Sequence, residues 1–158
     1  MLDSGATPTN GTLSERLMSL NVTCLCGSMS LDLHGSPAAR ANCHCSSCRD
    51  FYGTSVFSAT AWASEAVSVG ERAGRTFKHP EKQMTKTFCD VCGEVVFGTN
   101  RLGMRVVPNA LTARATGGKL DAALAPTMHL FYRERVVDVV DDLPKYLDGW
   151  DGPTYAAE

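Results

Sequence analysis

The stretch Cys43-His44-Cys45-Ser46-Ser47-Cys48-Arg49 organises this chain, because its cysteines form a C-x-C-x-x-C pattern. Two cysteine pairs flank it at a distance, Cys24-Leu25-Cys26 upstream and Cys89-Asp90-Val91-Cys92 downstream. These three clusters contain all 7 cysteines of the chain. Two pairs supply the four thiolates of a closed zinc site, whereas a group of three supplies a zinc site with one open position.

The composition is that of one ordinary folded domain. A chain of 158 residues buries roughly 70% of its unfolded surface, and its hydrophobic content of 44% is normal. The net charge is −2, and acidic and basic residues are mixed along the chain. These features argue against a nucleic-acid partner and against a membrane surface as partner. The sequence carries no indication of an oligomeric state.

The ends of the chain differ from its middle. Residues 1–20 are rich in Ser, Thr, Gly and Asn and lack the apolar core of a secretory signal, so we expect a poorly ordered leader. We place a zinc-binding domain at residues 21–148 and a tail at residues 149–158. Without an export signal the expected location is cytoplasmic, where clustered cysteines bind metal more often than they form disulfides.

Short apolar runs separated by Gly and Pro predict a mainly β domain. In residues 28–33, Met29, Leu31 and Leu33 alternate with polar residues, as in a half-buried strand. Residues 109–116 are ambiguous, because their Ala and Leu favour a helix while flanking Pro and Gly leave little room for one. A turn of helix is predicted at 49–53. Further strands are predicted at 54–62, 67–69, 76–78, 85–88, 94–99, 105–107, 127–132 and 136–140.

The two outer pairs resemble zinc knuckles, Cys24-x-Cys26-Gly27 and Cys89-x-x-Cys92-Gly93. The glycine after the second cysteine permits the positive φ that such a turn needs. One zinc held by both pairs would tie the start of the fold to its middle and contribute to stability. The alternative is a redox dithiol at Cys89 and Cys92, but no βαβ pattern surrounds them.

The central group offers three thiolates, from Cys43, Cys45 and Cys48, and open zinc sites are those that carry out chemistry. Two alternatives stay open. In one, His44, His129 or Asp50 closes the site as a fourth ligand. In the other, Cys45 and Cys48 form a zinc ribbon with the downstream pair and three cysteines are left over.

The order of these motifs resembles the glutathione-dependent formaldehyde-activating (Gfa-like) family, whose vertebrate relatives include a centromere protein. The resemblance runs from about Val22 to Tyr146. The matching pieces are Cys24-x-Cys26-Gly27, Cys43-His44-Cys45-x-x-Cys48-Arg49 with Gly53, Phe88-Cys89-x-x-Cys92-Gly93, Gly118-Lys119-Leu120-Asp121, Pro126-x-x-His129-Leu130-Phe131 and Asp142-Leu143-Pro144-x-Tyr146.

The resemblance implies a mainly β, Mss4-like fold of small antiparallel sheets pinned by zinc. It also implies a carbon–sulfur lyase that forms or splits a glutathione–aldehyde adduct such as S-(hydroxymethyl)glutathione. The chain departs from the family pattern at Glu94 and at Val136-Val137. Two zinc ions are implied, a structural one on Cys24, Cys26, Cys89 and Cys92 and a catalytic one on Cys43, Cys45 and Cys48.

Three further residues are candidates for the chemistry. Arg49 follows the last cysteine of the central group and would offset its negative charge, unless it pairs with Asp50. His44 is a candidate acid or base, or a partner that orients the cysteine loop. His129 is a pocket candidate on a predicted strand. A zinc-stabilised binding or interaction module without turnover is the alternative function, because the Mss4-like architecture permits it.

Overall fold

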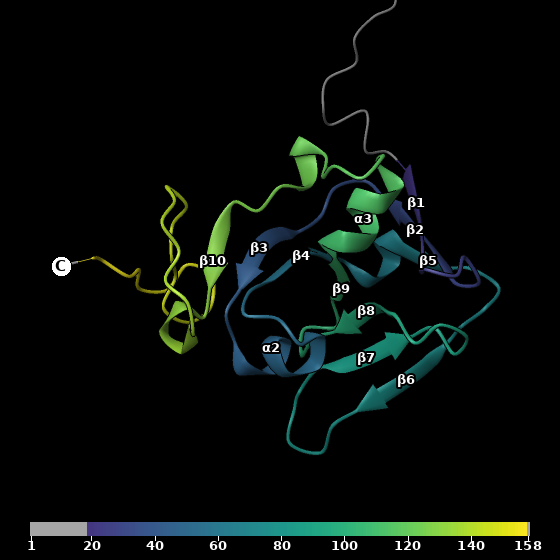
Figure 1. Ribbon diagram of the computed structural model, residues 1–158, viewed down its shortest axis with the longest axis horizontal. Helices are drawn as coiled ribbons and strands as arrows, with labels where there is room; N and C mark the ends of the chain where they lie inside the picture. Colours follow the sequence, from purple (N-terminus) through teal and green to yellow (C-terminus); the bar gives the residue numbers. More distant parts are fainter. Residues whose placement is uncertain (1–18, 158) are drawn as a thin grey trace, which may run out of the picture.

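The structure is a computed structural model, and it describes residues 19–157. Its strands form two sheets, with orders β1-β2-β5 and β10-β3-β4-β9-β8-β7-β6 (Figure 1). Neighbouring strands are antiparallel except β10 and β3, so the predicted mainly β fold of antiparallel sheets is confirmed. The strands are β1 (Ser19–Thr23), β2 (Ser30–His34), β3 (Ala39–Cys43), β4 (Phe57–Trp62), β5 (Val67–Val69), β6 (Arg75–Lys78), β7 (Thr85–Phe88), β8 (Val95–Thr99), β9 (Arg105–Pro108) and β10 (Met128–Leu130). The helices of this part of the chain are α2 (Ser46–Tyr52), α3 (Asn109–Ala115) and the single 3-10 turns η1 (Ser64–Ala66), η2 (Ala122–Leu124) and η3 (Tyr132–Glu134).

Two strands were not anticipated from the sequence. β3 reads ARANC and has none of the β-branched residues that favour strands, yet it lies between β10 and β4. β1 begins at Ser19, two residues before the expected start of the domain, and Leu20 packs against the core. The rest of the expected leader, residues 1–18, lies outside the described residues.

The strand predicted at 136–140 is wrong. Val136 and Val140 are 62% and 100% exposed, and the segment pairs with no strand of the described chain. The backbone N–H of Val139 donates instead to the Tyr132 hydroxyl. Its apolar side chains therefore do not pack on a sheet. The apolar composition of the segment alone did not predict its structure correctly.

The ambiguous segment after β9 forms helix α3. Pro108 occupies the N-cap position, where its missing N–H costs no intrahelical bond. The helix ends where the Gly118 N–H donates to the carbonyl of Ala113. α3 packs against β1 of the small sheet and against β9 and β4 of the large one, so it joins the two sheets.

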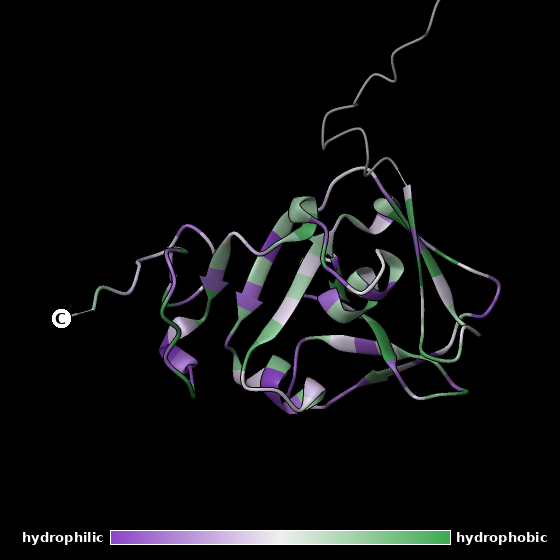
Figure 2. Cartoon of the chain, turned by 45° about the horizontal axis from the view of Figure 1, so that its top comes forward, coloured by the Kyte–Doolittle hydropathy of each residue, from purple (hydrophilic) through white to green (hydrophobic). Residues whose placement is uncertain are grey.

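The main core lies where the two sheets and α3 meet. Trp62, Leu31, Leu33 and Leu111 are buried there, and the Trp62 indole donates to the Thr60 hydroxyl. Figure 2 shows hydrophobic and hydrophilic residues alternating along strands of the large sheet. This alternation gives such strands one face towards a core and one towards polar surroundings, whereas all residues of the edge strand β6 are exposed.

The segment after β10 folds back onto that strand. His129 bridges to Lys145, and Tyr146 bridges to Thr154 in the expected tail. Figure 1 shows this C-terminal segment, in yellow, beside β10. None of the helices within residues 19–157 has the length and apolar character needed to span a bilayer.

Candidate metal centres

The first candidate centre links the two sheets. Cys24 and Cys26 follow β1 of the small sheet, and Cys89 and Cys92 stand between β7 and β8 of the large one. The four Sγ atoms lie within 4.8 Å of one another, with 3.7 Å between Cys26 and Cys89. Hydrogen bonds from Ser28 lower the pKa of Cys26 to about 6, towards the thiolate form that binds metal.

The backbone of each knuckle turns its two thiols towards the same point. Gly27 and Gly93 have φ of 76° and 79°, and their N–H groups donate to the carbonyls of Cys24 and Cys89. The Val91 N–H donates to the Cys89 sulfur over 3.4 Å. Backbone hydrogen bonds of these turns thus direct the sulfurs of each pair to one point, as in a zinc knuckle.

Glu94, one of the departures from the family pattern, connects the two knuckles. Its Oε2 accepts a hydrogen bond of 2.6 Å from the backbone N–H of Leu25. The same oxygen lies 2.8 Å from Nη2 of Arg114, which also donates to the Thr23 carbonyl. Glu94 therefore ties the downstream knuckle to the upstream one and to α3.

The second candidate centre forms where β3 meets α2. Cys43 ends β3, Cys45 caps α2 and accepts a hydrogen bond from the N–H of Cys48, and the three sulfurs lie within 4.8 Å of one another. We call these three residues the trio. Cys89 and Cys92 group with the first centre, so the arrangement is not that of the zinc ribbon considered above.

No histidine or carboxylate of the described chain joins the trio as a fourth ligand. His44 turns its Nε2 to Nδ1 of His129 over 2.8 Å, and His129 turns its Nε2 to Asp141 over 2.9 Å. Asp50 pairs with Lys82 at 3.0 Å. The three residues that could have closed the site are thus engaged elsewhere.

Both histidines are fully buried, as expected for an interior pair. Burial, followed by the neighbouring His129, lowers the pKa of His44 to about 4. The backbone N–H of His44 donates to the Leu130 carbonyl, which holds the cysteine loop against β10. His44 is therefore neutral near pH 7 and stands next to the trio in the chain without facing its cavity.

Arg49 fastens the segment after β10 to helix α2. Its Nη1 donates to the carbonyl of Glu134 over 3.0 Å, and Oε2 of Glu134 accepts from the N–H of Ser46 over 2.7 Å. The alternative partner, Asp50, is taken by Lys82. Arg49 thus positions one wall of the site.

Lys86 is the residue that the sequence did not single out. It lies on β7, is only 2% exposed, and its Nζ has no hydrogen-bond partner among residues 19–157. The ammonium stands over the ring of Tyr52, 4.0 Å from its centroid. A lysine in a predicted strand is ordinarily expected to face solvent, so no sequence signal pointed to it.

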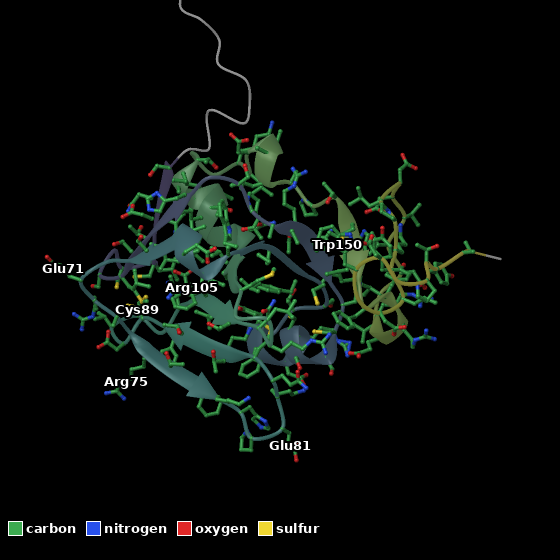
Figure 3. All side chains as sticks on the ribbon, turned by 180° about the vertical axis from the view of Figure 1, so that it is seen from behind. Glu71, Arg75, Glu81, Cys89, Arg105 and Trp150 are labelled. Atoms are coloured by element: carbon green, nitrogen blue, oxygen red, sulfur yellow. The ribbon has the colours of Figure 1, made fainter. Side chains whose placement is uncertain are left out.

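A cavity of about 540 Å³ opens beside the trio, a size typical of small-molecule sites. Arg49, His44 and His129 do not line it. Figure 3 shows Trp150, on its rim, well apart from Cys89 of the first centre. The floor consists of small residues on β3 and β4, Ala39, Ala41, Ala59 and Ala61, and charged residues on the walls are Glu81, Lys82, Arg101 and Glu134.

The donor set of the trio fits a thiophilic cation. Hydrogen bonding to Cys45 and Cys48 raises the pKa of Cys43, while the hydrogen bond from Cys43 lowers the pKa of Cys45 to about 2. Three thiols this close cannot all ionise without a cation between them, and a metal ion removes that conflict. Sulfur donors in this number suit zinc.

Comparison with known proteins identifies the family of the chain. The family model described as "Glutathione-dependent formaldehyde-activating enzyme" matches residues 19–134. A search of curated proteins gave no match. A crystal structure of a Rhodobacter sphaeroides protein is similar at 20% identity, with 58% of this chain and 86% of that chain covered and a TM-score of 0.47. Because the family model spans most of the chain, the chain belongs to the glutathione-dependent formaldehyde-activating enzyme family.

Proposed function

We propose that this protein is a zinc-dependent carbon–sulfur lyase or synthase acting on a glutathione–aldehyde adduct such as S-(hydroxymethyl)glutathione. Family membership supports the glutathione and formaldehyde chemistry. The observation that carries the proposal is a group of three cysteines that opens into a cavity and has no fourth ligand among the described residues. The many clustered thiols suit a reducing compartment such as the cytosol.

The two cysteine groups take different roles in this proposal. Cys24, Cys26, Cys89 and Cys92 would hold a structural zinc, because they complete a four-sulfur set and join the two sheets. Cys43, Cys45 and Cys48 would hold the catalytic zinc. Zinc bound there would stabilise a substrate thiol in its nucleophilic thiolate form.

The cavity offers complementary surfaces for an adduct of glutathione. Arg101 and Lys82 are basic groups on its wall that suit the two carboxylates of glutathione, and Glu81 suits its ammonium group. The alanine floor, with Ala41 and Ala59 only 9% and 8% exposed, leaves open volume beside Cys43. The aldehyde carbon would lie over this floor.

The remaining residues position groups and can stabilise the oxygen of the adduct. Ionisation of the substrate thiol releases one proton to solvent. Addition of the thiolate to the aldehyde forms the C–S bond and leaves an alkoxide, which takes up one proton from solvent; cleavage runs in reverse. Ser46 and Ser47 line the cavity beside the trio, and we propose that a hydroxyl of one of them donates a hydrogen bond to that oxygen. His44, His129 and Arg49 act as positioning residues that hold the cysteine loop and the cavity wall.

The test is whether the protein accelerates exchange between free and glutathione-bound ¹³C-formaldehyde, measured by exchange NMR with the uncatalysed reaction as reference. We expect acceleration by the parent and an uncatalysed rate for Cys48→Ser, with one zinc retained and an unchanged circular dichroism spectrum. A parent protein that leaves the uncatalysed rate unchanged would contradict the proposal and favour the non-catalytic module.

A further inference from the structure

Lys86 is a buried cation without a carboxylate partner. It is 2% exposed, and no oxygen of the described residues accepts a hydrogen bond from its Nζ. Burying an ammonium group costs a large free energy of desolvation unless a negative charge lies nearby. The residues around Lys86 should therefore include an anion that offsets its charge.

Aromatic rings surround the ammonium group but do not supply that anion. The Nζ atom lies 4.0, 5.0 and 5.8 Å from the ring centroids of Tyr52, Phe51 and Phe57. Such cation–π contacts favour a cation in this place, since the ring faces are electron-rich. Burial raises the pKa of the Tyr52 hydroxyl, so this ring stays neutral. The rings therefore fix the position of the charge without neutralising it.

Gly98 makes room for the ammonium group. A Cβ atom at this position of β8 would lie 3.1 Å from Nζ of Lys86 and 2.8 Å from the end of Met84. Gly98 and Lys86 face each other across the β7–β8 ladder. The strand thus has a glycine where any side chain would press on the buried lysine.

We propose that Lys86 is the fixed positive countercharge of the Cys43–Cys45–Cys48 centre. Two of the aromatic rings that enclose its ammonium group, those of Tyr52 and Phe57, belong to the same buried cluster as Cys48 and the rest of the trio. Zinc with three thiolates carries a net charge of −1, and binding of a substrate thiolate makes the net charge −2. A cation buried near the centre lowers the free energy of the centre both without and with the substrate thiolate.

The electrostatics of Lys86 support the assignment. Burial lowers its pKa to about 8, and the thiolates of Cys48, Cys45 and Cys43 act in the opposite direction. Lys86 is buried among rings that pack on the trio, whereas Arg49 directs its Nη1 to the Glu134 carbonyl and does not line the cavity. The inference rests on the proposed function, because it requires a metal on the trio.

The experiment compares Lys86→Met with a matched control, Lys82→Met. Methionine keeps most of the volume of the lysine and removes its charge. Lys82 lines the cavity beside the trio and pairs with the exposed Asp50, so its replacement removes a positive charge near the trio without changing Lys86. Zinc affinity of the trio is measured by competition with a chelator, while the zinc on the four-cysteine centre reports an intact fold.

We expect Lys86→Met to weaken zinc binding at the trio by about tenfold or more, and Lys82→Met to leave it within about twofold. In the cobalt-substituted proteins, loss of the lysine should also move the thiolate-to-cobalt charge-transfer band to lower energy. The sulfur electrons rise in energy when a nearby cation is removed, so the direction of this shift follows from the charge. A purely structural role would not produce it.

Gly98→Ala provides a second test in which Lys86 remains. The added Cβ presses on the end of Met84 and shifts Nζ by a few tenths of an ångström, so we expect a smaller loss of zinc affinity at the trio and a band shift of the same sign. The role of Lys86 would be overturned if Lys86→Met had the zinc affinity and the cobalt spectrum of the parent protein. If Lys86→Met does not fold, the same result in Gly98→Ala would overturn it. A parent protein without metal on the trio would overturn the proposed metal centre and this inference together.

Discussion

His44 and His129 share a hydrogen bond of 2.8 Å between Nε2 of the first and Nδ1 of the second. Asp141 sets its direction: hydrogen bonds, first from Lys145 and also from His129, lower the pKa of Asp141 to about 2. The ionised carboxylate only accepts, so Nε2 of His129 carries a proton; in the neutral imidazole, Nδ1 then accepts from His44. The chain of three side chains fixes the tautomers of both histidines and holds the cysteine loop against β10.

Replacing His129 with leucine should destabilise the protein by about 1–3 kcal/mol, because it leaves the Nε2 proton of His44 buried without an acceptor. The free energy of unfolding in urea measures this loss. The control is His34→Leu, since His34 is an exposed residue of β2. Equal stability of the two variants would contradict the assigned hydrogen-bond chain.

Asp141→Asn should lower the free energy of unfolding by about 1 kcal/mol near neutral pH, a modest amount because the carboxylate is partly exposed. Folding lowers the Asp141 pKa from 3.8 to about 2, so the unfolded state binds more protons below about pH 4. The stabilisation is therefore complete above that pH and is lost as the pH falls towards 2. Urea unfolding of both proteins should show a constant difference from pH 5.5 to 8; a gap that changes across that range would argue against this origin.

Glu94→Ala should destabilise the protein by about 1–2 kcal/mol, because it removes the acceptor for the Leu25 N–H and the partner of Arg114. Thermal and urea unfolding measure the loss. Glu71→Ala is the matched control, since Glu71 is an exposed carboxylate in the loop between β5 and β6 (Figure 3). If both substitutions have the same small effect, Glu94 does not connect the knuckles.

The two cysteine groups should respond differently to substitution. Cys92→Ser removes a ligand from the centre that joins the two sheets, so we expect loss of its zinc and a fall in melting temperature of roughly 10 °C or more. Cys48→Ser should lose the other zinc with a smaller change in melting temperature. Zinc content and circular dichroism melts distinguish the variants, and equal destabilisation would indicate that both centres are structural.

The sequence predicted most of the sheet-forming segments and the group of Cys43, Cys45 and Cys48 because both signals are local. Alternation of Met29, Leu31 and Leu33 reports one buried strand face, and all three are buried. The spacing of Cys43, Cys45 and Cys48 brings their sulfurs together across one strand end and one helix turn. In such cases residues close in the chain decide the structure.

Features that depend on distant partners could not be predicted. β3 is a strand because β10 and β4 lie on either side of it, and its own residues do not favour that conformation. Val136 and Val140 have strand-forming side chains but no neighbouring strand within residues 19–157. Lys86 is buried because its strand, β7, packs against the aromatic residues of α2 and pairs with β8 at Gly98. Its burial therefore depends on three segments that are separate in the chain.

The central claim is that the trio holds a zinc ion with a position open to a thiol. Zinc content and zinc-edge X-ray absorption, recorded while glutathione is added to protein purified without chelator, test it most directly. The account predicts two zinc ions per chain, one with four sulfur ligands throughout and one that changes from three sulfurs to four as glutathione binds. A single zinc ion, or two whose ligand shells do not respond to glutathione, would contradict the claim.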